Sequence, residues 1–162
     1  MNNKDNLKLI SNEKNTLLMI LCEKTRGYPF KSTILELLTL GPSCCNLKQV
    51  NDNGYTALMI ACHNKMTDVA LKILEYGPEE CNLKHVSYNV YNGYTTLMIA
   101  CHNKMTDVAL KILEYGPEEC NLNYKASDKF NALYYAKQKK LKSVINKIKE
   151  YNSEENNSCK IV

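Results

Sequence analysis

The amino-acid sequence predicts an all-α solenoid of about four helix-turn-helix units joined by hairpin loops. Residues Leu58 to Leu83 recur without a change as Leu97 to Leu122, 39 positions later. Each copy contains two apolar stripes at helical spacing, and the second stripe ends at a Gly-Pro pair. A fixed period of this size is typical of stacked repeat arrays, in which one unit cannot bury its apolar face without its neighbours.

The pattern begins near the N-terminus, in a more diverged unit at residues 11–50. An apolar stretch from Thr16 to Cys22 predicts its first helix, and Thr33 to Leu40 predicts its second. Gly41-Pro42 ends the second helix, because glycine accepts a left-handed cap and proline cannot continue a helix. The loop between these helices is longer than in the other units, and residues 1–10 form an N-terminal extension.

The second unit, residues 51–86, shows the pattern most plainly. A threonine precedes a predicted helix from Ala57 to His63, whose apolar residues recur at helical spacing. Thr67 or Asp68 is expected to cap a second helix, which ends at Gly77-Pro78. An Asn-Gly dipeptide before the first helix favours a tight hairpin turn.

The third unit, residues 87–125, copies both helices, but the hairpin that leads into it is different. The segment from Lys84 to Tyr91 makes this connection three residues longer than its counterparts. The fourth unit, residues 126–151, has Lys137 and Lys149 where the third unit has apolar residues. Charges at these positions suit a final unit with nothing stacked beyond it.

The positive charge of the chain lies at its C-terminal end. The last 38 residues contain nine lysines and four acidic residues, a net +5, whereas the rest of the chain carries −1. A charged outer face is what a terminal repeat requires, so a solvated cap is favoured over contact with nucleic acid, which is not an expected partner. Residues 152–162 are polar and are expected to form a flexible tail.

The composition is that of an ordinary globular chain. The hydrophobic fraction is 44%, and no apolar run approaches the roughly 20 residues that a membrane helix needs. The first six residues are polar and lack the apolar stretch of a signal peptide. We therefore expect an intracellular, cytoplasmic protein that is a monomer.

The eight cysteines do not indicate disulfides or a zinc site, because no C-x-x-C pair occurs. Cys22, Cys62 and Cys101 each end an apolar helical stretch. A free cysteine in such a place behaves as a small apolar residue. We predict that these three side chains lie in the core.

The segment N-G-Y-T-A-L-M-I-A-C at residues 53–62 resembles the ankyrin repeat signature D-G-x-T-P-L-H-L-A-A. The second helix and Gly77 also match the pattern of that family, and the resemblance extends over most of the chain. Ala57 replaces the signature proline, Met59 the histidine, and Lys65-Met66 the Gly-His turn. The near-identical copies and the Asn-, Lys-, Ile- and Tyr-rich composition also resemble ankyrin arrays of large DNA viruses that infect amoebae.

The resemblance implies a protein that binds another protein and has neither enzymatic activity nor a cofactor. Members of the ankyrin family bind partners at the hairpin tips and on the exposed face of the inner helices. Carried over by motif, with the longer third hairpin added, the expected partner-binding residues are Asp52, Asn53, Tyr55, His63, Asn64, His85, Tyr88, Tyr91, Asn92, Tyr94, His102, Asn103 and Phe130. The last unit offers Ser127, Asp128, Gln138 and Lys139 at matching positions.

Two features of this set indicate where specificity lies. The first is the row formed by Tyr55, Tyr94 and Phe130, because aromatic rings supply binding energy at low entropic cost. The alternative is that each ring packs locally on its own hairpin. The second feature is the long third hairpin with its tyrosines Tyr88 and Tyr91, which is our preferred location for the specificity of binding.

No group of residues has a spacing that indicates catalysis or metal binding. His63, His85 and His102 have no nucleophile or carboxylate at triad spacing, so we interpret them as solvated or partner-contacting histidines. The final four residues, Cys159 to Val162, resemble a C-a-a-X prenylation box with basic residues upstream, although Lys160 and Val162 depart from the usual pattern. The alternative function is therefore a membrane-recruited adaptor that is lipidated at Cys159.

Overall fold

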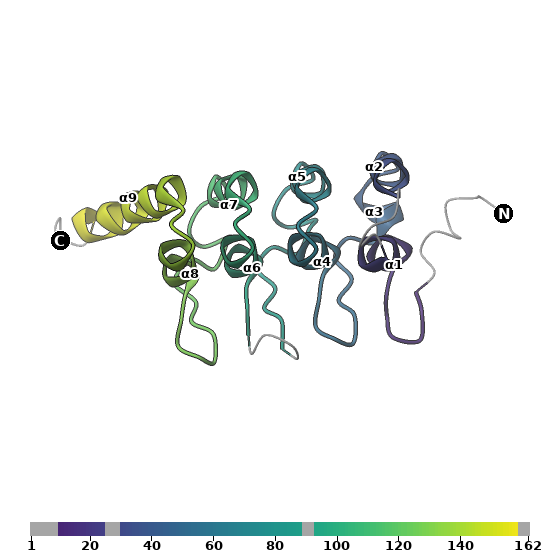
Figure 1. Ribbon diagram of the computed structural model, residues 1–162, viewed down its shortest axis with the longest axis horizontal. Helices are drawn as coiled ribbons and strands as arrows, with labels where there is room; N and C mark the ends of the chain where they lie inside the picture. Colours follow the sequence, from purple (N-terminus) through teal and green to yellow (C-terminus); the bar gives the residue numbers. More distant parts are fainter. Residues whose placement is uncertain (1–9, 25–29, 89–92, 159–162) are drawn as a thin grey trace.

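In the computed structural model, paired helices stand side by side in two rows along the array (Figure 1). The structure describes residues 10–24, 30–88 and 93–158. The inner row contains α1 (Leu17–Lys24), α4 (Ala57–His63), α6 (Thr96–His102) and α8 (Ala132–Gln138). The outer row contains α2 (Lys31–Leu38), α5 (Thr67–Leu74), α7 (Thr106–Leu113) and α9 (Lys142–Ser158), and the short α3 (Pro42–Cys45) follows α2.

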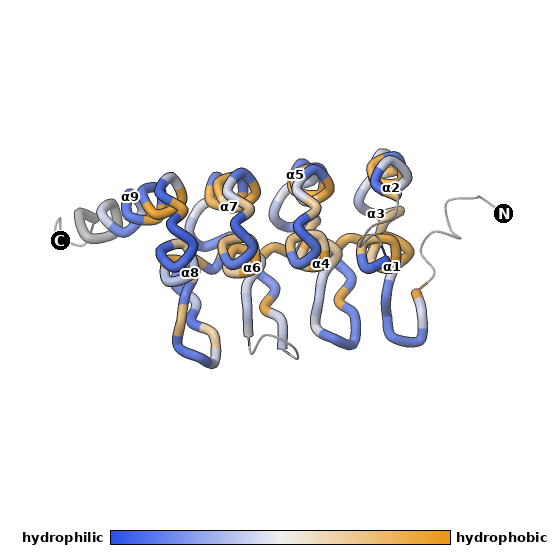
Figure 2. The backbone as a smooth tube through the Cα atoms, viewed as in Figure 1, coloured by the Kyte–Doolittle hydropathy of each residue, from blue (hydrophilic) through white to orange (hydrophobic). Residues whose placement is uncertain are grey.

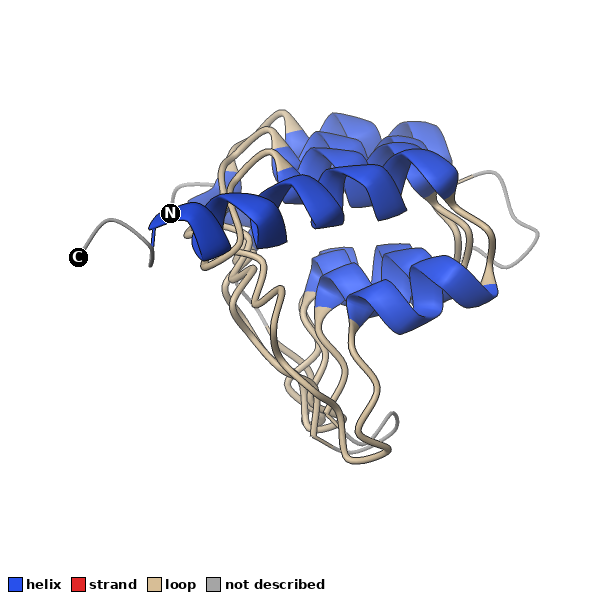
Figure 3. Cartoon of the chain, turned by 90° about the vertical axis from the view of Figure 1, so that its left-hand side faces the viewer, coloured by secondary structure: helices blue, strands red, loops and turns tan. Residues whose placement is uncertain are grey.

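The described residues form the all-α ankyrin-type solenoid that the sequence predicts. They contain helices and loops but no strand, only the isolated bridges Ile10–Thr16 and Val86–Thr95. Each inner helix contacts the outer helix of its own pair, and both rows contact the next pair along the array. Viewed from the end, the hairpin loops all extend to the same side of the helices (Figure 3). None of the described helices is both long enough and apolar enough to cross a membrane.

Each inner helix begins after a side chain that caps it. In every case a side-chain oxygen accepts a hydrogen bond from the backbone N–H three residues later, and the four capping residues are Thr16, Thr56, Thr95 and Asn131. Such a cap satisfies a helix N–H that has no partner inside the helix, and it is worth about 1 kcal/mol. The threonine that precedes the inner helix in the sequence pattern therefore determines where that helix starts.

The outer helices begin without a side-chain cap, which differs from the expected capping by Thr67 or Asp68. The residue before α5 is Met66, and no side chain caps the helix there. Lys65 adopts a left-handed conformation with φ 58°, and the N–H of Met66 donates to the carbonyl of Ala61 at 2.9 Å. This tight turn leads the chain directly from α4 into α5, so Thr67 is already the first helical residue.

Two further boundaries differ from the sequence-based expectations. Helix α2 begins at Lys31 and ends at Leu38, two residues earlier at each end than predicted. Helix α9 continues to Ser158, although residues 152–162 were expected to be a flexible tail. The sequence of α9 contains no glycine or proline, so no residue with a strong helix-breaking effect interrupts it.

The core is continuous along the array because the inner helices are enclosed by their neighbours. In α4, every side chain from Ala57 to Cys62 is buried, whereas α5 buries only Val69, Ala70, Ile73 and Leu74. Cys22, Cys62 and Cys101 are all buried, which confirms their predicted place in the core. Burial raises the pKa of the Cys22 and Cys101 thiols to about 12, so these groups stay protonated and unreactive at neutral pH.

A tyrosine on the outer row links each of the last three units to the preceding one, and it follows α5 and α7 but lies within α9. Its hydroxyl donates to the carbonyl of the last residue of the preceding outer helix, and the pairs are Tyr76 to Leu38, Tyr115 to Leu74, and Tyr151 to Leu113. The first unit has Leu40 at this position, and its side chain is 42% exposed because the described chain has no helix pair on that side. In the second and third units, the tyrosine therefore faces the preceding unit, and the carbonyl that accepts the next bond faces the following unit.

We expect Tyr115→Phe to lower the free energy of unfolding by about 1 kcal/mol, because it removes one hydrogen bond between units and keeps the ring. The carbonyl of Leu74 still accepts from the N–H of Gly77, so the loss stays near that value. Urea denaturation followed by circular dichroism measures it. Tyr134→Phe, which removes a hydroxyl that makes no hydrogen bond among the described residues, is the control, and equal stability of the two variants would contradict the role of the Tyr115 hydroxyl.

Two adjacent threonines at the start of α6 should respond in opposite directions. The Thr95 side chain caps the helix, whereas the Oγ1 atom of Thr96 is buried with no hydrogen-bond partner among the described residues. Thr95→Ala should lower the free energy of unfolding by about 1 kcal/mol. Thr96→Ala, which introduces the residue found at Ala57 and Ala132, should raise it by about 1 kcal/mol. Destabilisation by Thr96→Ala in thermal unfolding would refute this assignment.

Candidate binding surface

Four hairpins extend side by side from the inner row of helices (Figure 1). Each hairpin is closed by the same backbone hydrogen bond, in which the N–H of its first residue donates to the carbonyl of its last. The closing pairs are Ser11–Asn15, Asn51–Tyr55, Ser87–Tyr94 and Ala126–Phe130, at 2.9–3.0 Å. The sequence therefore builds one repeated tip per unit, and these tips form an edge of the array.

The third hairpin contains its three additional residues inside the closed tip. Ser87 and Tyr94 are seven positions apart, whereas the closing residues of the other hairpins are four positions apart. Ser87 is buried, and its hydroxyl lies 3.1 Å from both the N–H and the carbonyl oxygen of Tyr94. Tyr91 and Asn92, which were expected to contact the partner, lie outside the described residues.

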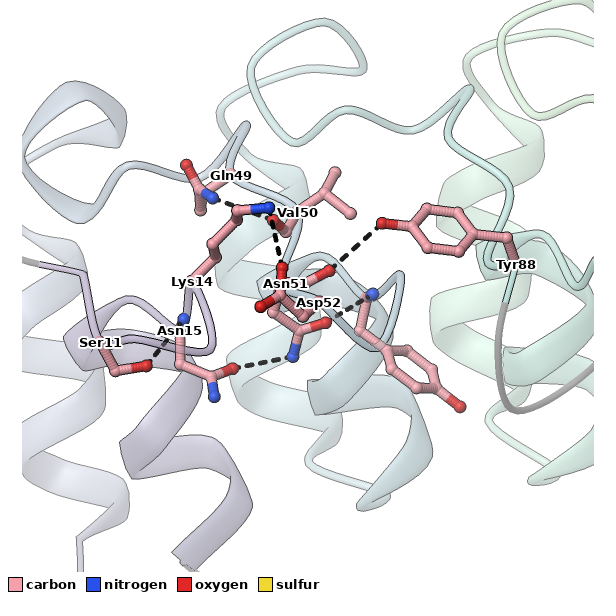
Figure 4. A network of polar contacts seen from close by, with 9 residues as sticks. Ser11, Lys14, Asn15, Gln49, Val50, Asn51, Asp52 and Tyr88 are labelled. Carbon is pink, nitrogen blue, oxygen red and sulfur yellow. Dashed lines mark hydrogen bonds and ion pairs between the residues drawn. The ribbon is translucent and has the colours of Figure 1, made fainter.

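Polar contacts join the first two hairpin tips into one surface (Figure 4). The Asn51 amide donates to the Asn15 side-chain oxygen at 2.8 Å, and its own oxygen accepts from the N–H of Tyr55 at 2.8 Å. Asp52 pairs with the Lys14 ammonium at 2.8 Å, and this exposed ion pair contributes little to stability. The N–H of Asp52 also donates to the carbonyl of Glu13 at 3.0 Å, and this backbone bond and the buried asparagines hold the two tips in a fixed relative position.

Tyr88 links the third tip to the second. Its hydroxyl lies 3.5 Å from the carbonyl oxygen of Asn51 (Figure 4). Its backbone and ring lie against Gly54. A Cβ atom on Gly54 would lie 2.9 Å from the backbone nitrogen of Tyr88, and Gly54 has a φ of +77°, so no other residue fits without strain. The His85 ring contacts the carbonyl of Gly54 at 3.0 Å. Tyr88 nevertheless remains 59% exposed.

The three rings of the expected aromatic row have different environments. Tyr55 is only 9% exposed and packs inside the array, which agrees with the local-packing alternative for this residue. Tyr94 is half-buried against Tyr135, with ring centroids 5.1 Å apart. Phe130 is 37% exposed and stacks on Tyr134, with centroids 3.6 Å apart. The row is therefore not a uniform strip of exposed rings.

Asp128 accepts hydrogen bonds from two tyrosines at the junction of the third and fourth units. The Tyr135 hydroxyl donates to its carboxylate at 2.7 Å, the Tyr94 hydroxyl lies 3.2 Å from the same oxygen, and the Phe130 N–H donates at 3.0 Å. Desolvation raises the pKa of Asp128, but these three hydrogen bonds, together with one from its own backbone N–H, outweigh it and lower the pKa below its usual value. The carboxylate is therefore ionised at neutral pH and joins the two hairpins.

Asn64 and Asn103, expected at the partner surface, instead connect neighbouring units. The Asn64 amide donates to the carbonyl of Cys22 at 2.9 Å, and the Asn103 amide donates to that of Cys62 at 3.1 Å. These carbonyls lie near helix C-termini, where the regular i to i+4 bonds of the helix end, and the carbonyl of Cys62 also accepts from the N–H of Lys65 at 3.3 Å. The repeated asparagine therefore satisfies the end of the preceding inner helix.

The histidines occupy the same side of the array without forming a reactive group. The His63 ring lies 6.4 Å from that of Tyr55, and the His102 ring lies 5.8 Å from that of Tyr135. Burial, together with Lys139 and Lys65, lowers the pKa of His102, so its imidazole is neutral at pH 7. Within the described part of the chain, no three metal-ligating side chains converge.

The sequence-based site prediction did not include Tyr135 and Tyr134. Tyr135 donates to Asp128 and Tyr134 stacks on Phe130, so both contact the fourth hairpin. They replace the Ile99 and Met98 of the third unit, and that change was the available signal. Asn53 is exposed at the second tip, and Ser127 and Gln138 are also exposed. Cys159, the candidate for lipidation, lies outside the described residues.

Comparison with known proteins agrees with this geometry. A family model described as ankyrin repeat matches residues 53–86. A solved structure described as the Bd0816 predatory endopeptidase from Bdellovibrio bacteriovorus in complex with immunity protein Bd3460 contains a similar chain, with a TM-score of 0.55 and 20% identity. The match covers 89% of this chain and 84% of that chain, and at this identity it shows the fold alone. No curated protein sequence gives a match.

The bonds to Asp128 should make the last junction sensitive to pH. Because the pKa of the folded state lies below that of the unfolded state, the stabilisation is complete above the usual aspartate pKa of about 3.9 and is lost as pH falls through the lower, folded value. Asp128→Asn should therefore lower the melting temperature at pH 7 and have a much smaller effect at low pH. Asp107→Asn, at an exposed site in α7, is the control. A deficit that does not depend on pH would contradict an ionised role for Asp128.

Proposed function

We propose that this chain is a non-enzymatic scaffold that binds a partner protein through its hairpin tips. Proteins that contain ankyrin repeats generally mediate contacts between proteins, and the ankyrin repeat model matches the second unit. The similar solved chain comes from a complex of two proteins. Resemblance to arrays of amoeba-infecting DNA viruses suggests a host protein as the partner, inside the host cell.

Tyr88 is the observation that carries the proposal. Its ring is the most exposed of the large apolar and aromatic side chains in the described residues, yet Gly54 and the carbonyl of Asn51 hold it in place. A fixed, exposed aromatic side chain loses little entropy on binding, and such residues supply much of the energy of protein interfaces. Among the other described aromatic candidates, Tyr55 and Phe130 lie in other hairpins, and Tyr94 is half-buried.

The remaining surface is polar and follows the tips on either side of Tyr88. Asn53 and Asp52 are exposed on the second tip, and Phe130 is 37% exposed on the fourth. Tyr55, Asn64 and Asn103 bond or pack within the array, so we assign them to support of the surface. The proposed contact region therefore centres on the third tip and extends to the second and fourth.

Shortening the third hairpin tests the proposal. Deleting residues 88–90 joins Ser87 to Tyr91 and gives Ser-Tyr-Asn-Gly-Tyr, the same length as Asn51–Tyr55. The helices should melt unchanged, because a surface loop contributes little to the core. Capture of partner proteins from cell extract, quantified by mass spectrometry, should fall by more than roughly tenfold, as expected for loss of an interface anchor.

Tyr88→Ala separates loss of the ring from loss of loop length, and Phe30→Ala is the control at an exposed aromatic side chain that precedes α2, away from this tip. Capture should fall with Tyr88→Ala and persist with Phe30→Ala. If the deletion and Tyr88→Ala both leave capture intact, the third tip is not the binding site.

A further inference from the structure

Most described lysines between residues 14 and 111 pair with acidic side chains, whereas most of those in residues 125–150 do not. Lys48 lies 3.1 Å from Glu80, and Lys84 lies 2.8 Å from Glu119. In residues 125–150, the ion pair between Lys147 and Glu150 is the single one among described side chains. The other lysines of this segment have no ion-pair partner among the described residues, and they are Lys125, Lys129, Lys137, Lys139, Lys140, Lys142 and Lys149.

Four lysines of the fourth unit are exposed on α8, on α9 and in the turn between them. Lys137 and Lys149 stand at positions where the third unit has Cys101 and Leu113. Those two side chains are buried in the third unit, whereas both lysines are exposed in the fourth, beyond which the described chain has no further unit. Both lysines therefore lie on the open end of the solenoid. Lys140, with φ 60°, is in the turn between α8 and α9, and Lys142 is the first residue of α9. This turn is strongly hydrophilic (Figure 2).

A polar cap explains why this end carries charge, but it does not explain why lysines outnumber acidic side chains there. Solubility of a terminal unit is served equally by acidic and basic side chains, and surfaces usually mix both. A cluster of one sign produces a local potential that attracts the opposite charge. We propose that Lys137, Lys140, Lys142 and Lys149, together the terminal lysine face, bind an acidic segment of a protein, separately from the hairpin tips.

An acidic polypeptide fits this face better than nucleic acid does. Binding of single strands relies on aromatic platforms for bases, and here Phe130 and Tyr134 cover each other by stacking. The face also lacks arginine, the side chain best suited to bidentate phosphate contacts, because the single arginine of the chain is Arg26.

A membrane surface fits less well, because amphipathic helices bind bilayers by inserting apolar side chains. The apolar residues of α9 face inward instead. Val144 and Ile148 are buried, and Ile145 packs partly buried against the core.

Two matched triple variants test the terminal lysine face. Lys137→Glu/Lys140→Glu/Lys149→Glu reverses the face, and Lys24→Glu/Lys65→Glu/Lys104→Glu reverses three exposed lysines elsewhere that are also without ion pairs among described residues. Each lowers the net charge by six, from +4 to −2. Lys65 and Lys104 have left-handed backbones in inter-helix turns, as Lys140 does, so the control also matches local structure.

Fluorescence anisotropy with a labelled oligoglutamate peptide gives the readout. The full-length protein should bind at low salt and more weakly as salt rises. The terminal triple should bind more than roughly tenfold more weakly, and the control triple less than roughly threefold more weakly. Circular dichroism melts check folding, and the Lys→Gln version of each triple replaces a Glu version that unfolds. Deleting residues 88–90 should leave peptide binding intact, so the outcome does not depend on the proposed function of the tips.

Three outcomes would overturn the proposal. If the unmodified protein does not bind oligoglutamate at low salt, the proposed site for an acidic segment is refuted. Equal losses in the two triples show that net charge alone attracts the peptide. Tighter binding to duplex DNA, or to vesicles containing phosphatidylserine, than to oligoglutamate at the same salt assigns the face to a different class of partner.

Discussion

Burial of each inner helix between its neighbours is the constraint on which the rest of the structure depends. Helix α4 has no exposed apolar face of its own, because every side chain from Ala57 to Cys62 is buried. Such a helix is stable only between α1 on one side and α6 on the other, with α5 covering it. The hairpin tips, the turns and the outer faces of the end units lie outside these buried contacts, so their sequences are less constrained by packing.

Polar bonds determine how the apolar surfaces meet. Apolar contact is not directional, so it brings units together without specifying their register. The tyrosine hydroxyls on the outer row and the asparagine amides on the inner row each reach a carbonyl at the end of a preceding helix. At the last junction Lys139 replaces the asparagine, and Asp128 with Tyr94 and Tyr135 supplies a different connection. Two different sets of polar bonds therefore hold neighbouring units in register on the inner row, the asparagine amides at the first two junctions and the Asp128 cluster at the last.

The repeated parts of the fold were readable from the sequence, because periodicity reports burial directly. Helix type, order and the buried cysteines followed from apolar spacing and Gly-Pro stops. Contacts between units were not readable, because Asn64 and Asn103 look like solvent-facing polar residues until the neighbouring carbonyls are in place. The burial of Tyr55 and the cluster around Tyr135 likewise depend on packing between units that are far apart in sequence. The extra length of the third hairpin was visible, but not that Ser87 closes it.

Each internal unit carries both halves of the outer-row bond on opposite faces. Tyr115 points its hydroxyl toward the second unit, while the carbonyl of Leu113 accepts from Tyr151 of the fourth. A unit copied whole therefore brings a donor for one neighbour and an acceptor for the other, and every junction it creates is already complete. Tandem duplication therefore leaves no outer-row donor or acceptor without its hydrogen-bond partner at the new junction. The unchanged stretch shared by the second and third units is what such growth leaves in a sequence, and the number of units in an array of this kind is free to change without redesign of its interfaces.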